Sequence, residues 1–154
     1  MDIDPAIKIR LVDACRKYVA EKVEHLQQAI RDLQNAANEE TKSSAGDKYE
    51  TGRAMAQLEI EKLTVQLHKT LPLHQALDKV ETRLKVDVID HGSVVFTDGG
   101  NYFIAISAGV IIVNNDSYFA VGINAPIALA LRGKKTGDVV DFNKKKLLVK
   151  NVIN

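Results

Sequence analysis

The chain of 154 residues has little of several residue types on which specialised proteins depend. It has one cysteine, Cys15, which excludes an internal disulfide and any paired-cysteine zinc or redox motif. It has no tryptophan and only 5% aromatic residues, too few for a surface on which nucleic-acid bases stack. Its longest nearly unbroken apolar run, residues 102–113, is shorter than the roughly 20 residues of a membrane helix. We therefore expect a cytoplasmic protein with no membrane partner.

The chain also lacks an excess of charge of either sign. Lys and Arg total 21 and Asp and Glu total 20, so the overall charge gives no reason to expect nucleic acid as a partner. The two parts of the sequence nevertheless differ, because every glutamate lies at or before Glu81 and seven of the nine glycines lie at or after Gly92. Glutamate favours helices and glycine favours turns. This contrast predicts a helical domain over residues 1–90 and a domain of short strands over residues 91–154.

Two long helices are expected in residues 1–90. Asp4 can cap the first helix, with Pro5 at its first position. A second helix is interrupted at Pro72, where we expect a kink or a short break. The facing apolar seams predict a long antiparallel coiled-coil hairpin. On the first helix, apolar residues recur every three or four positions, at Leu11, Cys15, Val19, Val23, Leu26, Ile30, Leu33 and Ala37. The seam of the second helix is predicted at Ala56, Ile60, Leu63, Leu67, Leu71, His74, Leu77 and Leu84.

Residues 91–154 alternate short apolar runs with turn residues. Residues 124–133 indicate a short helix, with Pro126 near its start and Gly133 just past its end. The whole pattern predicts an α+β fold, in which the helical hairpin precedes a small antiparallel sheet with one short helix packed on it. The expected strands cover residues 93–97, 101–107, 110–113, 117–122, 138–143 and 146–153.

Residues 120–140 resemble the C-terminal signature of bacterial Gre-type transcription elongation factors. The run Asn124-Ala125-Pro126-Ile127-Ala128 stands in the matching place, and so do Gly133-Lys134 and Gly137-Asp138. The order of the two expected domains also matches. The resemblance implies an FKBP-like fold for the C-terminal domain. It further implies that partner binding involves Asn124, Pro126, Gly133, Lys134 and Asp138.

The same resemblance implies a function in transcription. Gre-type factors bind RNA polymerase at its secondary channel and promote cleavage of backtracked RNA, whose 3′ end they approach only indirectly. Such a factor is not itself an enzyme, because the polymerase cuts the RNA and the factor supplies carboxylates from the tip of its hairpin. Hydrolysis of this kind uses two metal ions about 4 Å apart, and Mg²⁺ takes carboxylate oxygens as ligands. The implied cofactor is a Mg²⁺ shared with the polymerase active site, with no metal held by the isolated chain.

The tip carboxylates are assigned by a short motif. The family motif Gly-Asp-x-x-Glu has the spacing of Gly46-Asp47-Lys48-Tyr49-Glu50, so the resemblance points to Asp47 and Glu50 as catalytic carboxylates. The same two residues fit an acidic capping box at the start of the second helix, a role compatible with metal binding. In another register, Tyr49 matches the family tyrosine, and the acidic positions then fall on Lys42 and Ala45. In that register Glu39 and Glu40, the secondary candidates, could supply the carboxylates only if the turn folds differently.

A second function from a different class stays open. The chain could occupy the polymerase channel, or bind another protein, without stimulating cleavage. The tip favours this alternative, because Glu50 is followed by Thr51-Gly52-Arg53 where the family has Asn-Ala-Glu-Tyr. A prolyl isomerase is disfavoured, since a domain poor in aromatic residues offers little for an apolar proline pocket. The run Lys144-Lys145-Lys146 predicts a solvated turn or, alternatively, a contact with phosphate or with an acidic surface.

Overall fold

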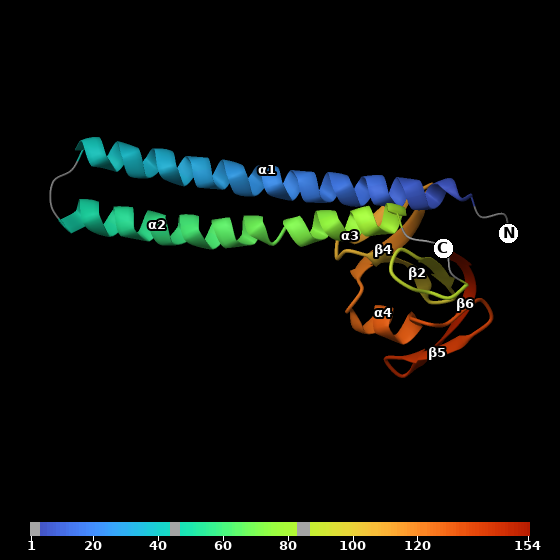
Figure 1. Ribbon diagram of the computed structural model, residues 1–154. Coiled ribbons are helices and arrows are strands. Elements are labelled where there is room, and N and C mark those ends of the chain that lie inside the picture. The colour runs from blue at the N-terminus through green and yellow to red at the C-terminus, as the bar shows by residue number, and fades with distance from the viewer. Residues whose placement is uncertain (1–3, 44–46, 83–86) are drawn as a thin grey trace. The chain divides into compact units, whose positions relative to one another are not determined.

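The structure, a computed structural model, describes residues 4–43, 47–82 and 87–154. Its fold is α+β, as the sequence predicts. Three helices come first, and six strands with one further short helix, α4, follow (Figure 1). The coiled-coil pairing of the long helices and the FKBP-like fold of the sheet stay predictions.

The chain divides into two compact units. Residues 1–18 and 74–154 form one, which we call the sheet unit, and residues 19–73 form the other, the helical unit. The domain boundary that the sequence predicts between residues 90 and 91 stays a prediction.

Helix α1, Ala6–Ser43, begins where the sequence predicts. The Asp4 carboxylate accepts a hydrogen bond of 2.9 Å from the backbone N–H of Ala6, so the predicted N-terminal cap is formed. The predicted apolar seam is the less exposed side of the helix. Its side chains are buried at Leu11, Cys15, Val19 and Leu26 and half-buried at Val23, Ile30, Leu33 and Ala37.

Two helices follow in place of one continuous second helix. Helix α2 spans Asp47–His68 and helix α3 spans Leu71–Thr82. The break expected at Pro72 is therefore confirmed, and Thr70 stabilises it by donating its hydroxyl to the Leu67 carbonyl at 2.6 Å. Leu71 was predicted to lie on the apolar seam but is 59% exposed, because the break rotates it out of the register of α2. Leu84, the last predicted seam residue, lies outside the described residues.

All six predicted strands are present, with ends shifted by at most two residues. They form one sheet in the order β3-β4-β2-β1-β6-β5. The strands are β1 Val94–Thr97, β2 Gly100–Ala105, β3 Gly109–Val113, β4 Asp116–Gly122, β5 Val139–Phe142 and β6 Lys145–Ile153.

The expectation of a purely antiparallel sheet is wrong, because β2 and β4 pair in parallel with Phe103 opposite Ala120. The connection from β2 places β3 at the edge of the sheet, two strand positions from β2. The turn at Asn114 and Asn115, with φ of 52° and 69°, then reverses the chain, so that β4 lies between β3 and β2. Strand β4 is therefore antiparallel to β3 and parallel to β2. The sheet is mixed.

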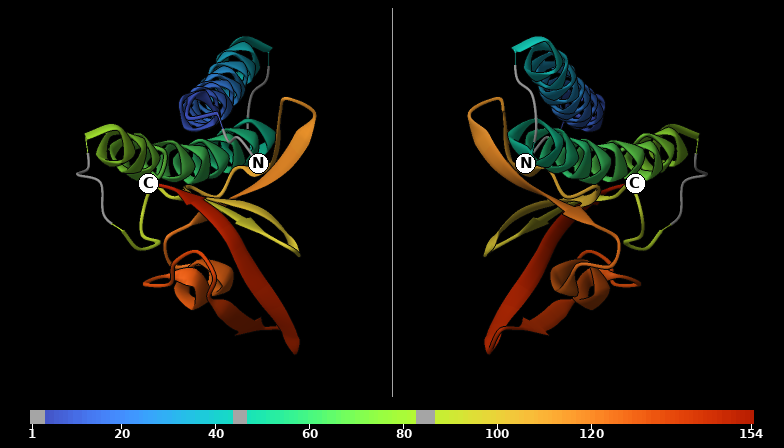
Figure 2. Two further views of the ribbon diagram at one scale, coloured as in Figure 1. Left: turned by 90° about the vertical axis from the view of Figure 1, so that its right-hand side faces the viewer. Right: turned by 90° about the vertical axis from the view of Figure 1, so that its left-hand side faces the viewer.

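The sheet is covered on both faces within the sheet unit, with α4 on one side and α3 on the other (Figure 2). Helix α4, Pro126–Leu131, packs its buried Ile127, Ala128 and Leu131 against buried Val95 and Ile104 of the sheet. The opposite face of the sheet carries buried side chains from β1, β2 and β4. These are Val94, Phe103, Ala105, Tyr118 and Ala120.

Candidate functional site

The two predicted tip carboxylates belong to the first turn of α2. Asp47 is the first residue of this helix and Glu50 the fourth, so they lie three residues apart, a spacing that places two side chains on one side of a helix. Glu50 is exposed. Helix α2 has 22 residues and is therefore about 33 Å long, with these two positions at its start.

The predicted tip turn falls on residues that the structure does not describe. Gly46 belongs to residues 44–46, which the structure does not describe, and the side chains of Glu40 and Asp47 are likewise not described. Glu39 is exposed near the end of α1. The choice between the two registers of the tip, and between a capping and a metal-directed role for Asp47, therefore stays a prediction.

Among the described residues, no group of three or more His, Cys, Asp or Glu side chains is placed so that it could hold a metal ion. Asp47 and Glu50 could supply one carboxylate group each from one helical turn. Mg²⁺ requires near-octahedral coordination. A metal at the start of α2 would therefore take most of its ligands from water, RNA or a partner protein.

The predicted partner-binding segment surrounds α4. Pro126 is the first residue of this helix, where its missing N–H costs nothing, and Ala125 is the capping residue in extended conformation. Asn124 is exposed and does not cap the helix. Gly133 follows the helix with φ of 80°, a left-handed conformation that glycine adopts without strain. The predicted helix start and stop signals are confirmed at Pro126 and Gly133.

Gly133 and Lys134 also form a backbone bridge to an earlier segment. The Gly133 N–H donates to the Ile89 carbonyl at 2.8 Å, and the Ile89 N–H donates to the Lys134 carbonyl at 2.8 Å. The Lys134 side chain stays exposed. This bridge fixes the end of α4 to the residues that lead into the sheet.

Asp138 closes the turn between α4 and β5. Its carboxylate accepts a hydrogen bond of 2.9 Å from the Lys135 N–H, and its own N–H donates to the Lys135 carbonyl at 3.0 Å. Its carbonyl accepts from the Val149 N–H at 2.9 Å, which ties the turn to β6. Gly133, Pro126 and Asp138 thus have structural roles in this segment, and Asn124 and Lys134 are the predicted residues whose side chains are open to a partner.

Sequence reasoning missed a polar cluster beside α4. Arg132 forms an ion pair with Asp90, with 3.2 Å between Nε and Oδ1, and the same oxygen accepts the His91 N–H at 2.8 Å. The His91 ring nitrogen Nε2 lies 2.9 Å from the Ala76 carbonyl in α3. The cluster therefore joins α4, the start of the sheet and α3. Arg132 and Ala76 lie far from Asp90 and His91 in sequence, so no local motif indicates the cluster.

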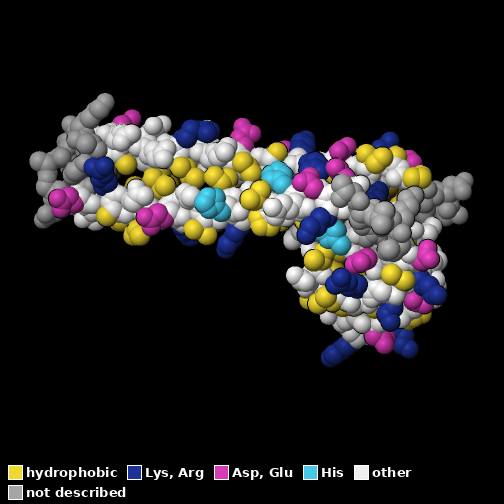
Figure 3. All heavy atoms as spheres, in the orientation of Figure 1, with side chains coloured by type: hydrophobic (Ala, Val, Ile, Leu, Met, Phe, Trp, Pro, Cys, Tyr) yellow, Lys and Arg dark blue, Asp and Glu magenta, His cyan; other side chains and the backbone are white. Residues whose placement is uncertain are grey.

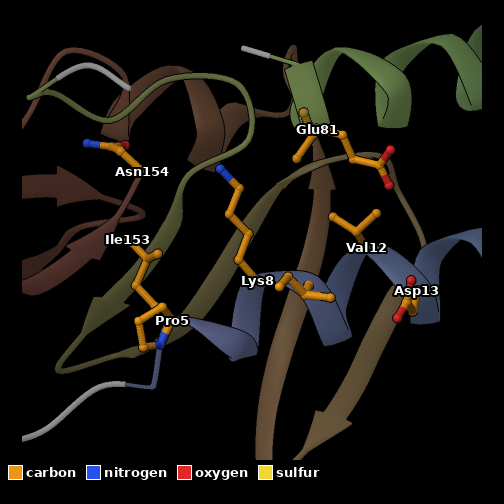
Figure 4. A pocket seen from close by; sticks show the side chains of 9 residues that line it. Pro5, Lys8, Val12, Asp13, Glu81, Ile153 and Asn154 are labelled. Atoms are coloured by element: carbon orange, nitrogen blue, oxygen red, sulfur yellow. The ribbon is translucent and has the colours of Figure 1, made fainter. Parts of the chain in front are cut away.

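A cleft of about 340 Å³ lies at another place in the sheet unit, between the start of α1, the end of α3 and the end of β6. Figure 4 shows the Lys8 side chain extending into it past Val12 and Ile153. The lining is mainly apolar, with charge from Lys8, Asp13 and Glu81. None of the predicted site residues lines this cleft.

Comparison with known proteins identifies no relative, since no family model, no curated protein and no solved structure matches the chain. None of the described helices combines the length and the apolar character needed to cross a bilayer.

Proposed function

We propose that the chain is a Gre-like transcription elongation factor of the cytoplasm, which binds RNA polymerase at the secondary channel and promotes cleavage of backtracked RNA. The observation that carries the proposal is the position of Asp47 and Glu50 in the first turn of α2. A carboxylate pair at the start of a helix about 33 Å long suits delivery to a buried active site.

The proposal includes a coiled-coil pairing of α1 and α2. On α2, Ala56, Ile60, Leu63 and Leu67 are half-buried at helical spacing, in the manner of the seam on α1. Helix α2 also runs in the direction opposite to α1 (Figure 1). Two facing seams of this kind suit an antiparallel hairpin. The proposal also includes an FKBP-like fold for the sheet domain, to which the α4 segment with Asn124 and Lys134 would contribute the polymerase contact.

In the proposed reaction the factor is an accessory, and the polymerase performs the chemistry. Asp47 and Glu50 would each offer a carboxylate oxygen to the more weakly held Mg²⁺ of the polymerase. Added negative ligands raise the occupancy of that ion, which orients water for attack on the phosphodiester. The isolated chain needs no bound metal for this role.

The test is an RNA cleavage assay on stalled elongation complexes with the polymerase of the same organism. Asp47→Asn and Glu50→Gln should each reduce stimulated cleavage by at least about tenfold while polymerase binding stays nearly unchanged. Asn can still cap a helix, so Asp47→Asn separates metal binding from capping. Raising the Mg²⁺ concentration should partly restore cleavage, because mass action offsets weaker ligation. Glu59→Gln, an exposed carboxylate of the same helix, is the matched control.

The assay also addresses the other assignments. If Asp47→Asn and Glu50→Gln cleave like the wild type, the other tip register applies and Glu39 and Glu40 become the carboxylates to test. If the wild-type chain binds polymerase but never stimulates cleavage, it is a regulator that occupies the channel. The departure from the family motif after Glu50 favours that second function.

A further inference from the structure

The positive charge of residues 91–154 is gathered in one stretch of the sequence. Within residues 91–154, every Lys and Arg lies between residues 132 and 150, whereas residues 99–115 carry no charge. Figure 3 shows dark blue Lys and Arg side chains on the lower part of the molecule, with magenta acidic side chains among them. We call this surface the basic end. Its cations, all exposed, are Arg132, Lys134, Lys135, Lys144, Lys145, Lys146 and Lys150.

Acidic residues offset part of this charge. Asp138 and Asp141 are the only acids in residues 132–150. The Asp138 carboxylate is already engaged by the Lys135 backbone N–H, and Asp141 stands opposite Lys146 across the β5–β6 pair. Residues 132–150 carry seven cations and two anions. Asp90 pairs with Arg132, and the Asp98 carboxylate accepts the Leu148 N–H of β6, so these two further acids lower the formal charge of the basic end to +3.

The cations form two groups along the β5–β6 hairpin. Hydrogen bonds of Val149 with Gly137 and Asp138 bring Lys150 beside the turn that carries Lys134 and Lys135. The other group, residues 144–146, lies at the opposite end of the hairpin. Strand β5 has four residues, so about 13 Å separates the groups. This spacing suits a polyanion that extends along the hairpin and does not suit one isolated phosphate.

One lysine is held at a conformational cost. In the turn between β5 and β6, Asn143 and Lys144 have φ of 50° and 65°. Such two-residue turns favour Asn-Gly, because glycine alone enters this region without strain. The β3–β4 turn adopts the same geometry with two asparagines, which tolerate it. The β5–β6 turn thus has a lysine at a position where glycine or asparagine fits better.

The side-chain chemistry favours the phosphate backbone over the bases. Six of the seven cations are lysines, compact point charges without the planar fork with which arginine reads a base edge. The one aromatic residue in this range, Phe142, is half-buried against the core, so no base can stack there. We propose that the basic end binds the phosphodiester backbone of duplex nucleic acid without sequence preference. This proposal is independent of the tip carboxylates.

The test uses the full chain and two fluorescent DNA duplexes of unrelated sequence, with binding followed by fluorescence anisotropy. Both duplexes should bind equally, with log K falling with log salt at a slope of about −3 to −5, as expected for several phosphate contacts. Replacing Lys144 by Gly, Lys145 by Gln and Lys146 by Gln together should weaken binding at low salt at least about tenfold and reduce the slope by about 3. Lys62→Gln, an exposed lysine of α2, should leave both unchanged.

Lys144→Gly alone is the control that distinguishes loss of a phosphate contact from misfolding. It relieves the positive φ, so it should raise the melting temperature while it weakens binding and reduces the slope by about 1. The proposal is overturned if the triple variant binds like the wild type, if binding is independent of salt, or if no binding occurs at 50 mM salt. Stronger competition by polyglutamate than by duplex of equal charge would also overturn it and would assign the basic end to an acidic protein.

Discussion

Cys15 lies on the buried side of α1 with no exposed surface, as the seam of apolar residues predicts. Burial disfavours the charged thiolate and raises the pKa of the thiol from 9.0 to about 12. The residue is therefore a small apolar core side chain that resists ionisation, and it is poorly suited to act as a nucleophile.

This burial predicts a specific alkaline sensitivity. Between pH 9 and 12 the unfolded chain loses the Cys15 proton while the folded chain keeps it, so stability present below pH 9 is lost as pH rises. The slope is at most about 1.4 kcal/mol per pH unit. Urea denaturation at pH 8, 9 and 10 should show a steeper loss for the wild type than for Cys15→Ala. Burial also raises the pKa of Tyr118, but this residue titrates alike in both proteins. Equal losses of stability with pH for the wild type and Cys15→Ala would therefore contradict the prediction.

At the residue scale, the sequence predicted the residues that act locally. Asp4, Pro126 and Gly133 have the helix-end positions that their chemistry favours, because a cap or a positive φ is decided within a few residues. The pair Arg132 and Asp90 was not predictable, since it depends on how α4 packs against the start of the sheet.

At the element scale, the positions of the helices and strands were predictable from periodicity, whereas the pairing of the strands was not. Alternating apolar residues predict where β2 and β4 lie but not that they pair in parallel, because that depends on where β3 is placed. For the candidate site, Asp47 and Glu50 lie in the first turn of α2, and their role as tip carboxylates stays a prediction. Whether they meet a metal depends on a partner that the sequence does not contain.

The seam of α2 leads to a matched pair of substitutions. Leu63 is half-buried on the seam, whereas Leu58 is 66% exposed on the same helix. Leu63→Ala should lower the free energy of unfolding by about 1–2 kcal/mol, because it removes contacts of a partly buried side chain. Leu58→Ala should change it by less than about 0.5 kcal/mol. Chemical denaturation of both variants gives the comparison, and equal losses would argue against pairing of α1 and α2 along this seam.

At the scale of the whole molecule, buried side chains are distributed unequally between the two units. In the described part of the helical unit, the buried side chains are Val19, Leu26 and Thr70. The sheet unit buries side chains from both faces of the sheet, including Val95 and Phe103 at 0% exposure. Apolar burial is the main source of local stability.

Native-state hydrogen exchange should therefore divide along the two units. We expect the amides of β1, β2 and β4 to exchange most slowly and those of α2 to exchange markedly faster, because few buried contacts oppose local opening of that helix. Mass spectrometry of peptic fragments measures both sets in one experiment. Uniform protection across α2 and the strands would show that the two units open only together.

The place of β6 in the sheet determines when the fold can be completed during synthesis. Strand β6 follows the other five described strands in the sequence, yet it lies inside the sheet, between β1 and β5. Until the ribosome has released Lys145–Ile153, β1 has one unpaired edge and β5 has no strand partner. Protease digestion of chains stalled before and after this segment should show resistance of β1 and β5 only after it emerges. The nascent chain therefore presents an open strand edge until β6 emerges, and cotranslational chaperones can bind that edge before then.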